Sequence, residues 1–199
     1  WLFTRYDAFG RMAFTGKVTG GTRTTEQDNA TGTSVNWTEQ TSSATTVDGT
    51  PLYYGTSGYP LLGSVTELHT VNYYDGYDAT RDGISLPSGQ VLGQDLATNV
   101  NGLPTSGRVR VLGTLTGYDE KGRPIWGRSE NEYLGTVDVS MSELDFTGRV
   151  LKQHNEHTKG TNPVIVTVDS YQYDHVGRLL SHKQDLGGHT ETIALNSYD

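Results

Sequence analysis

The stretch YQYDHVGRL, residues 171–179, contains the pattern that decides the fold. In its core, Asp is followed by Gly three residues later and by Arg four residues later, and Tyr precedes the Asp. Four copies of this D-x-x-G-R core occur, one with Leu144 in place of the Tyr, and the chain ends on Tyr198-Asp199, the start of another copy. Because the later copies recur at intervals of about 25 to 29 residues, they indicate tandem repeats. The motif residues are Tyr6, Asp7, Gly10, Arg11, Tyr118, Asp119, Gly122, Arg123, Asp145, Gly148, Arg149, Tyr173, Asp174, Gly177 and Arg178.

Each copy has the chemistry of a tight bend between two strands. An Asp side chain accepts backbone N–H groups at the first position of a turn, and Gly three residues later supplies a positive φ. The flanking residues alternate with the period of half-buried strands, as in Val137, Val139 and Met141. Opposite bends are indicated at 131–136, 155–163 and 185–189. The sequence therefore predicts an all-β fold, an antiparallel meander of repeated β-hairpins with little helix.

The segment 17–111 lacks this regularity. It begins with a polar, Thr-rich stretch without helical periodicity, for which we expect short strands and loops. A strand is expected within 64–78, and an excursion with at most one short helical turn near 91–97 is expected within 85–107. We therefore expect a first copy of the repeat in 1–16, an insertion or degenerate units of β and loop structure in 17–111, and three tandem repeats in 112–199, ending at the start of a fourth.

Composition limits the classes of partner. Hydrophobic residues make up 33% of the 199, with 12 Tyr against 4 Phe, which suits thin sheets with one wet face. The net charge of −8 without a Lys or Arg cluster argues against nucleic acid as a partner. Zero Cys excludes disulfides, and no apolar run is long enough to span a membrane.

The four copies and their spacing resemble the rearrangement-hotspot, or YD-repeat, family. The resemblance covers roughly 1–16 and 112–199, and the stretches LHTVNYYDGYDAT and GLPTSGRVRVLGT also resemble bacterial members of the Bacteroidetes type. The resemblance implies a large secreted or cell-surface bacterial protein whose repeats wind into a continuous sheet or hollow shell. In toxin members the shell encloses a carboxyl-terminal effector, and in animal teneurins a similar shell supports adhesion.

Two departures from the family pattern restrict what the resemblance implies. No stretch matches the conserved core with which toxin members cut their effector free, and no effector sequence is present, so self-cleavage is not expected. The chain opens within one copy of the pattern and closes within another, from which we expect a piece of a longer protein. The rest of that parent chain, with further repeats and an effector, is then its first partner.

The motif Asp and Arg residues are open to a chemical and a structural interpretation. Asp7, Asp119, Asp145 and Asp174 could act as acids, but their place before x-x-G favours a role in turn formation. The four Arg residues could bind anions, but pairing with nearby Asp or stacking on Tyr is favoured. No serine elbow, phosphate loop or dinucleotide fingerprint occurs, so we predict no cofactor, no catalytic residue and no enzyme.

Two further sets of residues are candidate sites. Asp75, Asp78 and Asp82 could bind calcium, although the full loop signature is absent and Asp-Gly is an ordinary turn; the prediction is therefore no metal site. The candidates for a surface that binds glycan or protein are Trp37, Tyr53, Tyr54 and Tyr59, for which packing is the alternative interpretation.

Two functions follow as hypotheses. The first is a non-catalytic structural segment of a shell or scaffold that encloses or presents another domain. The alternative is a module that binds a glycan or protein at the cell surface through 17–111.

Overall fold

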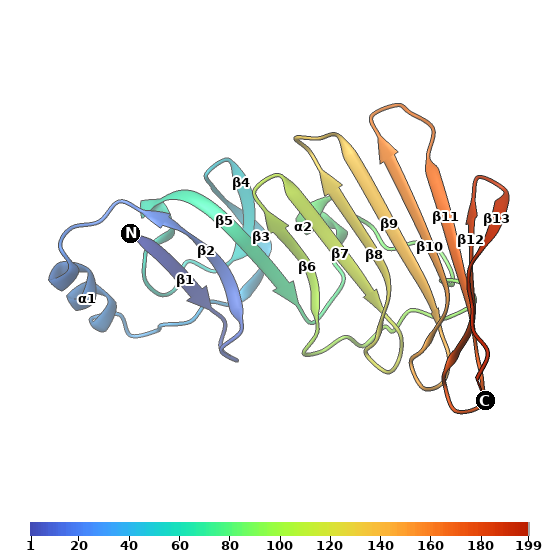
Figure 1. Ribbon diagram of the computed structural model, residues 1–199. Helices are drawn as coiled ribbons and strands as arrows, with labels where there is room; N and C mark the ends of the chain where they lie inside the picture. The colour runs from blue at the N-terminus through green and yellow to red at the C-terminus, as the bar shows by residue number, and fades with distance from the viewer. Residues whose placement is uncertain (199) are drawn as a thin grey trace.

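The computed structural model describes residues 1–198, except for the side chains of Thr80 and Asp82. Within this part of the chain, one antiparallel sheet contains 11 strands, laid side by side in chain order apart from the step between β2 and β5 (Figure 1). The predicted all-β antiparallel meander is therefore confirmed. The strands of this sheet are β1 (Leu2–Tyr6), β2 (Met12–Val18), β5 (Val65–Tyr74), β6 (Pro104–Val109), β7 (Leu112–Tyr118), β8 (Pro124–Asn131), β9 (Thr136–Leu144), β10 (Val150–Lys159), β11 (Ile165–Tyr173), β12 (Leu179–Leu186) and β13 (His189–Leu195).

The four D-x-x-G-R copies form bends that lie in one row, at the same end of the strands of this sheet. They join β1 to β2, β7 to β8, β9 to β10 and β11 to β12. The Gly of each copy has a positive φ, from 74° at Gly122 to 95° at Gly148, which residues with a Cβ adopt only with strain. The remaining connections between β7 and β13 lie at the opposite ends of the strands and form a second row of bends.

The segment 17–111 contains both insertions and strands of the main sheet. β5 and β6 pair with each other and fill the gap between β2 and β7. The first insertion, 19–64, holds the helix α1 (Arg23–Thr31), the hairpin of β3 (Gln40–Val47) and β4 (Thr50–Tyr54), and the 3-10 helix η1 (Leu62–Ser64). The second insertion, 75–103, contains the short helix α2 (Ala79–Asp82).

One local expectation is wrong. The stretch 23–31 forms a helix and not strand or loop; Thr22 caps it through the Thr25 N–H, and none of its residues is buried, so it has no apolar periodicity that a sequence pattern could reveal. The stretch 91–97, for which at most one short helical turn is expected, contains a tight turn and no helix. Val91 and Gln94 exchange backbone hydrogen bonds around Leu92 and Gly93, which both have positive φ.

Both insertions cover the same face of the sheet. Across the strands, Tyr73 is paired with Ser106 and Ser106 with Leu115, so the side chains of all three point to one face. This face and the first insertion together form a core of Ala13, Phe14, Val47, Leu52, Tyr54, Leu62, Leu68, Val71 and Tyr73. Under the second insertion, the same face forms a core of Ile84, Val91, Leu115, Ile125 and Trp126.

The C-terminal strands have no such cover. Among the described residues of β9 to β13, no hydrophobic side chain is fully buried, and β10 to β13 form a single layer with solvent on both sides. The sheet is therefore two layers thick at its N-terminal end and one layer thick at its C-terminal end.

Candidate functional site

Every D-x-x-G-R turn is closed by the same set of contacts to its Asp carboxylate. In the last turn, Oδ1 of Asp174 accepts the backbone N–H groups of Val176 and Arg178 at 3.0 and 2.8 Å, and Oδ2 accepts Nε–H of Arg178 at 2.7 Å. The equivalent bonds occur in the other three turns, with distances from Oδ2 to Nε of 2.6 to 2.7 Å. Asp and Arg are thus joined within each bend, and the carboxylate has no free role as an acid. The pairs are Asp7–Arg11, Asp119–Arg123, Asp145–Arg149 and Asp174–Arg178.

These hydrogen bonds lower the pKa of the carboxylates of Asp119, Asp145 and Asp174. Desolvation alone would raise the pKa of Asp174, but the hydrogen bonds from Arg178 and Val176 outweigh it and lower the pKa to about 2. At Asp145, the hydroxyl of Thr147 makes the largest contribution and holds the pKa well below its usual range. Groups with such low pKa values are poor general acids or bases at neutral pH.

A second set of contacts joins each turn to the turn before it. The hydroxyl of Tyr173 donates to the carbonyl of Val150, the residue after Arg149, at 3.0 Å, and the Arg149 guanidinium lies over the Tyr173 ring at 5.4 Å. Tyr198 repeats the arrangement one unit later, with its hydroxyl on the Leu179 carbonyl and Arg178 over its ring at 4.3 Å. We call this series of Asp–Arg turns linked through Tyr the turn ladder.

The turn ladder includes a unit that the motif search missed. The hydroxyl of Tyr74 donates to the Met12 carbonyl at 3.0 Å, and Arg11 lies over the Tyr74 ring at 4.3 Å. The following Asp75 accepts the backbone N–H of Gly102 and donates its own N–H to the carbonyl of Leu103. Leu103 therefore occupies the place of the motif Arg, and residues 76–102 are inserted into the turn.

The unit after the insertion keeps the ladder contact. The hydroxyl of Tyr118 donates to the carbonyl of Pro104, which follows Leu103 as Val150 follows Arg149. In the unit after that, Leu144 stands in the Tyr position and has no hydroxyl to donate. There Nη1 of Arg123 donates to the Asp145 carbonyl at 3.0 Å and makes the link between the two turns.

Two of the three Asp residues considered for calcium, Asp75 and Asp78, lie next to an Arg side chain. The carboxylate of Asp75 is bound by both terminal nitrogens of Arg11, at 2.8 and 2.6 Å, and this contact lowers its pKa. Asp78 lies 3.4 Å from Arg81, and the side chain of Asp82 lies outside the described residues. In the part of the chain that the structure describes, no group of three or more His, Asp or Glu residues could hold a metal ion.

The four aromatic candidates do not form one surface. Tyr54 is buried, stacks on Tyr73 with ring centroids 5.4 Å apart, and donates its hydroxyl to the Asn72 carbonyl. Tyr53 packs against the same core, whereas Trp37 is exposed. Tyr59 is half-buried and donates to Glu26. Tyr54 is therefore corrected to a core residue, and its burial raises the pKa of its hydroxyl.

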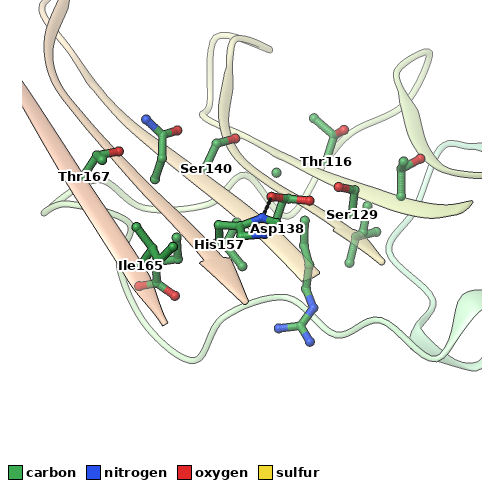
Figure 2. Close-up of a pocket in the computed structure, with 14 residues that line it drawn as sticks. Thr116, Ser129, Asp138, Ser140, His157, Ile165 and Thr167 are labelled. Carbon is green, nitrogen blue, oxygen red and sulfur yellow. Dashed lines mark hydrogen bonds and ion pairs between the residues drawn. The ribbon is translucent and has the colours of Figure 1, made fainter. Parts of the chain in front are cut away.

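A hollow of about 390 Å³ lies on the uncovered face of the sheet, over β7 to β11. Figure 2 shows the side chains of Asp138 and His157 joined across neighbouring strands, where Nδ1 of His157 lies 2.6 Å from Oδ1 of Asp138. Polar side chains line the hollow together with the apolar residues Leu115, Val139 and Ile165, so it offers both hydrogen bonds and apolar contact. Labelled with the pair in Figure 2 are Thr116, Ser129, Ser140, Ile165 and Thr167.

Comparison of the chain with protein-family models and with curated proteins finds no match. The described residues contain no helix that is both long and apolar enough to cross a membrane.

Proposed function

We propose that this chain is a non-catalytic structural segment of a large secreted or cell-surface protein, and that its sheet is part of a shell or scaffold that encloses or presents another domain. The secreted or surface location, the bacterial source and the YD-repeat class are parts of this proposal and rest on the resemblance of the repeated motif.

The observation that carries the proposal is the turn ladder. Its contacts run from one unit to the next, and they do not depend on a hydrophobic core, since they occur both at the two-layer end and at the one-layer end. A sheet built in this way gains length by adding units, as repeat proteins do. A sheet that can be extended without a hydrophobic core is better suited to a shell or scaffold than to a catalytic domain.

The uncovered face supports the same role. Both insertions lie on one side of the sheet, which leaves the other side, with its hollow, open over five strands. A face that combines polar and apolar side chains is typical of surfaces through which domains make weak contacts. The outer edge of β13 has no neighbouring strand in the described chain and could pair with a further unit.

Extension of the sheet by one unit tests the proposal. A second copy of residues 175–199 is appended after Asp199, so that Asp199 takes the place of Asp174 in a new turn. We expect two additional strands, and slower amide hydrogen exchange in β13 because its outer edge becomes paired. The matched control carries the same addition, with Val and Leu at the copied positions of Gly177 and Arg178, and should leave β13 unchanged. If the intact copy stays unstructured and β13 exchanges as before, the sheet does not extend by repetition and the scaffold proposal fails.

A further inference from the structure

Two adjoining hollows lie at the N-terminal end of the molecule, where Figure 1 shows α1 beyond β1 and β2. Their volumes are about 370 and 290 Å³, and both are lined by Val18, Glu26 and Tyr59. Together they reach the size at which proteins bind small molecules, about 300 to 1,000 Å³. The turn ladder does not involve these residues.

The walls of the hollows are held in place by specific contacts around Gly20 and Gly21. Oε1 of Glu26 accepts the Gly21 N–H at 2.6 Å, and the indole Nε1–H of Trp1 donates to the Gly21 carbonyl at 3.1 Å. A Cβ on Gly20 would lie 2.7 Å from the Trp1 ring and 2.8 Å from the Glu26 carboxylate, so glycine allows both side chains to close in. The aromatic ring and the carboxylate are thereby fixed next to each other.

The polar groups of the hollows are arranged to accept hydrogen bonds. The Tyr59 hydroxyl donates its proton to Oε2 of Glu26, and its oxygen is hydrogen-bonded to the Asn29 side chain. Each carboxylate oxygen of Glu26 accepts one hydrogen bond, from Gly21 or from Tyr59, and keeps a further lone pair that can accept from a ligand. A ligand rich in hydroxyl donors would match this set.

The charge of the lining narrows the ligand class. The lining contains no Lys, Arg or His side chain, and the α-ammonium of Trp1 donates to the Val18 carbonyl and lies near the Glu26 carboxylate, so no side-chain charge there attracts a phosphate or another anion. The apolar lining includes Trp1, which is 52% exposed and presents indole surface to solvent. A ring with an apolar C–H face and hydroxyl groups at its rim fits a site that joins aromatic surface to acceptors.

From these contacts we propose that the hollows between β1, α1 and residues 59–64 form a binding site for a neutral sugar. The sugar stacks on Trp1, and its hydroxyl groups donate to the remaining lone pairs of the Glu26 carboxylate. The site is independent of the proposed scaffold function and would give the scaffold a means of attachment to glycans.

Titration of the whole chain with maltose, cellobiose, lactose and N,N′-diacetylchitobiose tests the site. We expect at least one disaccharide to shift the backbone amide signals of Gly20 and Gly21 and the indole signal of Trp1 saturably, with a Kd on the order of 1 mM. Trp1→Ala should weaken binding about tenfold, because it removes the stacking surface. Glu26→Gln should weaken it through the loss of an acceptor oxygen.

Trp37→Ala is the matched control, because Trp37 is a partly exposed Trp that lines neither hollow, and it should leave the affinity unchanged. Each variant is compared at a temperature where its melting curve shows it folded. The site is refuted if no disaccharide produces saturable shifts, or if folded Trp1→Ala and Glu26→Gln variants both bind as the unaltered chain does. It is also refuted if choline produces the shifts and the sugars do not, since that result would indicate a cation site.

Discussion

The two ends of the sheet are built on the same turns but have different energetic support. Phe14, Tyr54 and Tyr73 at the N-terminal end are almost completely buried between the sheet and the β3–β4 hairpin, whereas the described part of β10 to β13 contains no buried hydrophobic side chain. The Asp–Arg turns and the Tyr links are nevertheless the same in both regions. The difference indicates that the ladder defines the unit, and that the hydrophobic cores are additions made by the insertions.

Truncation of Phe14 should have the largest effect of the changes considered. Phe14→Ala removes a fully buried ring that contacts Tyr54 at 5.6 Å between centroids, so we expect a loss of about 3 to 5 kcal/mol in the free energy of unfolding. The control Phe146→Ala truncates a ring that is 86% exposed at a turn, and should cost about 0.5 kcal/mol or less. Urea unfolding measures both. Equal losses of unfolding free energy for the two variants would mean that the two-layer end and the one-layer end do not differ in hydrophobic support.

A change of Gly177 tests one of the turns in the one-layer end of the sheet. Gly177 has φ of 89°, and Gly177→Val should cost about 1 to 3 kcal/mol, because a β-branched residue is strained there. Gly63→Val is the control, since Gly63 does not have a positive φ and has open space around its Cβ position. An unchanged melting temperature for Gly177→Val would show that this bend has been misassigned.

Removal of one hydroxyl tests the link between turns with a smaller expected effect. Tyr173→Phe keeps the ring under Arg149 but loses the hydrogen bond to the Val150 carbonyl, and should cost about 0.5 to 1.5 kcal/mol. Hydrogen exchange should quicken mainly in β11 and β12. Tyr133→Phe, at an exposed bend, should change neither quantity. Exchange that quickens evenly over the whole sheet would speak against a local link.

Acid titration of the last turn should give the smallest effect. The pKa of Asp174 is lowered from 3.8 to about 2 in the folded chain, so its contribution to stability is present above about pH 4 and is lost as the pH falls through about 2. The amide signals of Val176 and Arg178, which bind this carboxylate, should titrate with a midpoint near 2. A midpoint near 3.8 would mean that the carboxylate is not held by these donors. Asp174→Asn should abolish the transition.

The regular parts of the fold could be predicted because they depend on local chemistry. Asp and Gly at fixed spacing determine a turn by themselves, and alternation of side chains determines the flanking strands, so the four turns and the meander were visible in the sequence. The pairing of Arg with Asp within each turn was favoured for the same reason.

The missed parts depend on contacts between distant residues. The Tyr74–Asp75 unit was hidden because residues 76–102 separate Asp75 from Leu103, and because Arg11 of another turn supplies its guanidinium. A Tyr-Asp pair directly after a predicted strand was the available signal. Helix α1 was hidden because it buries no residue, and the hollow at Trp1 and Glu26 was hidden because it joins three separate segments.

The most direct test of the turn ladder is a double-mutant cycle between Arg149 and Tyr173, which lie in successive turns of the one-layer end of the sheet. Arg149→Leu, Tyr173→Leu and the double variant are unfolded in urea together with the unaltered chain. If the ladder joins neighbouring units, the two changes should be coupled by about 0.5 to 1 kcal/mol. Strictly additive effects would show that the contact between Arg149 and Tyr173 adds no cohesion between the two turns, and would contradict this part of the ladder.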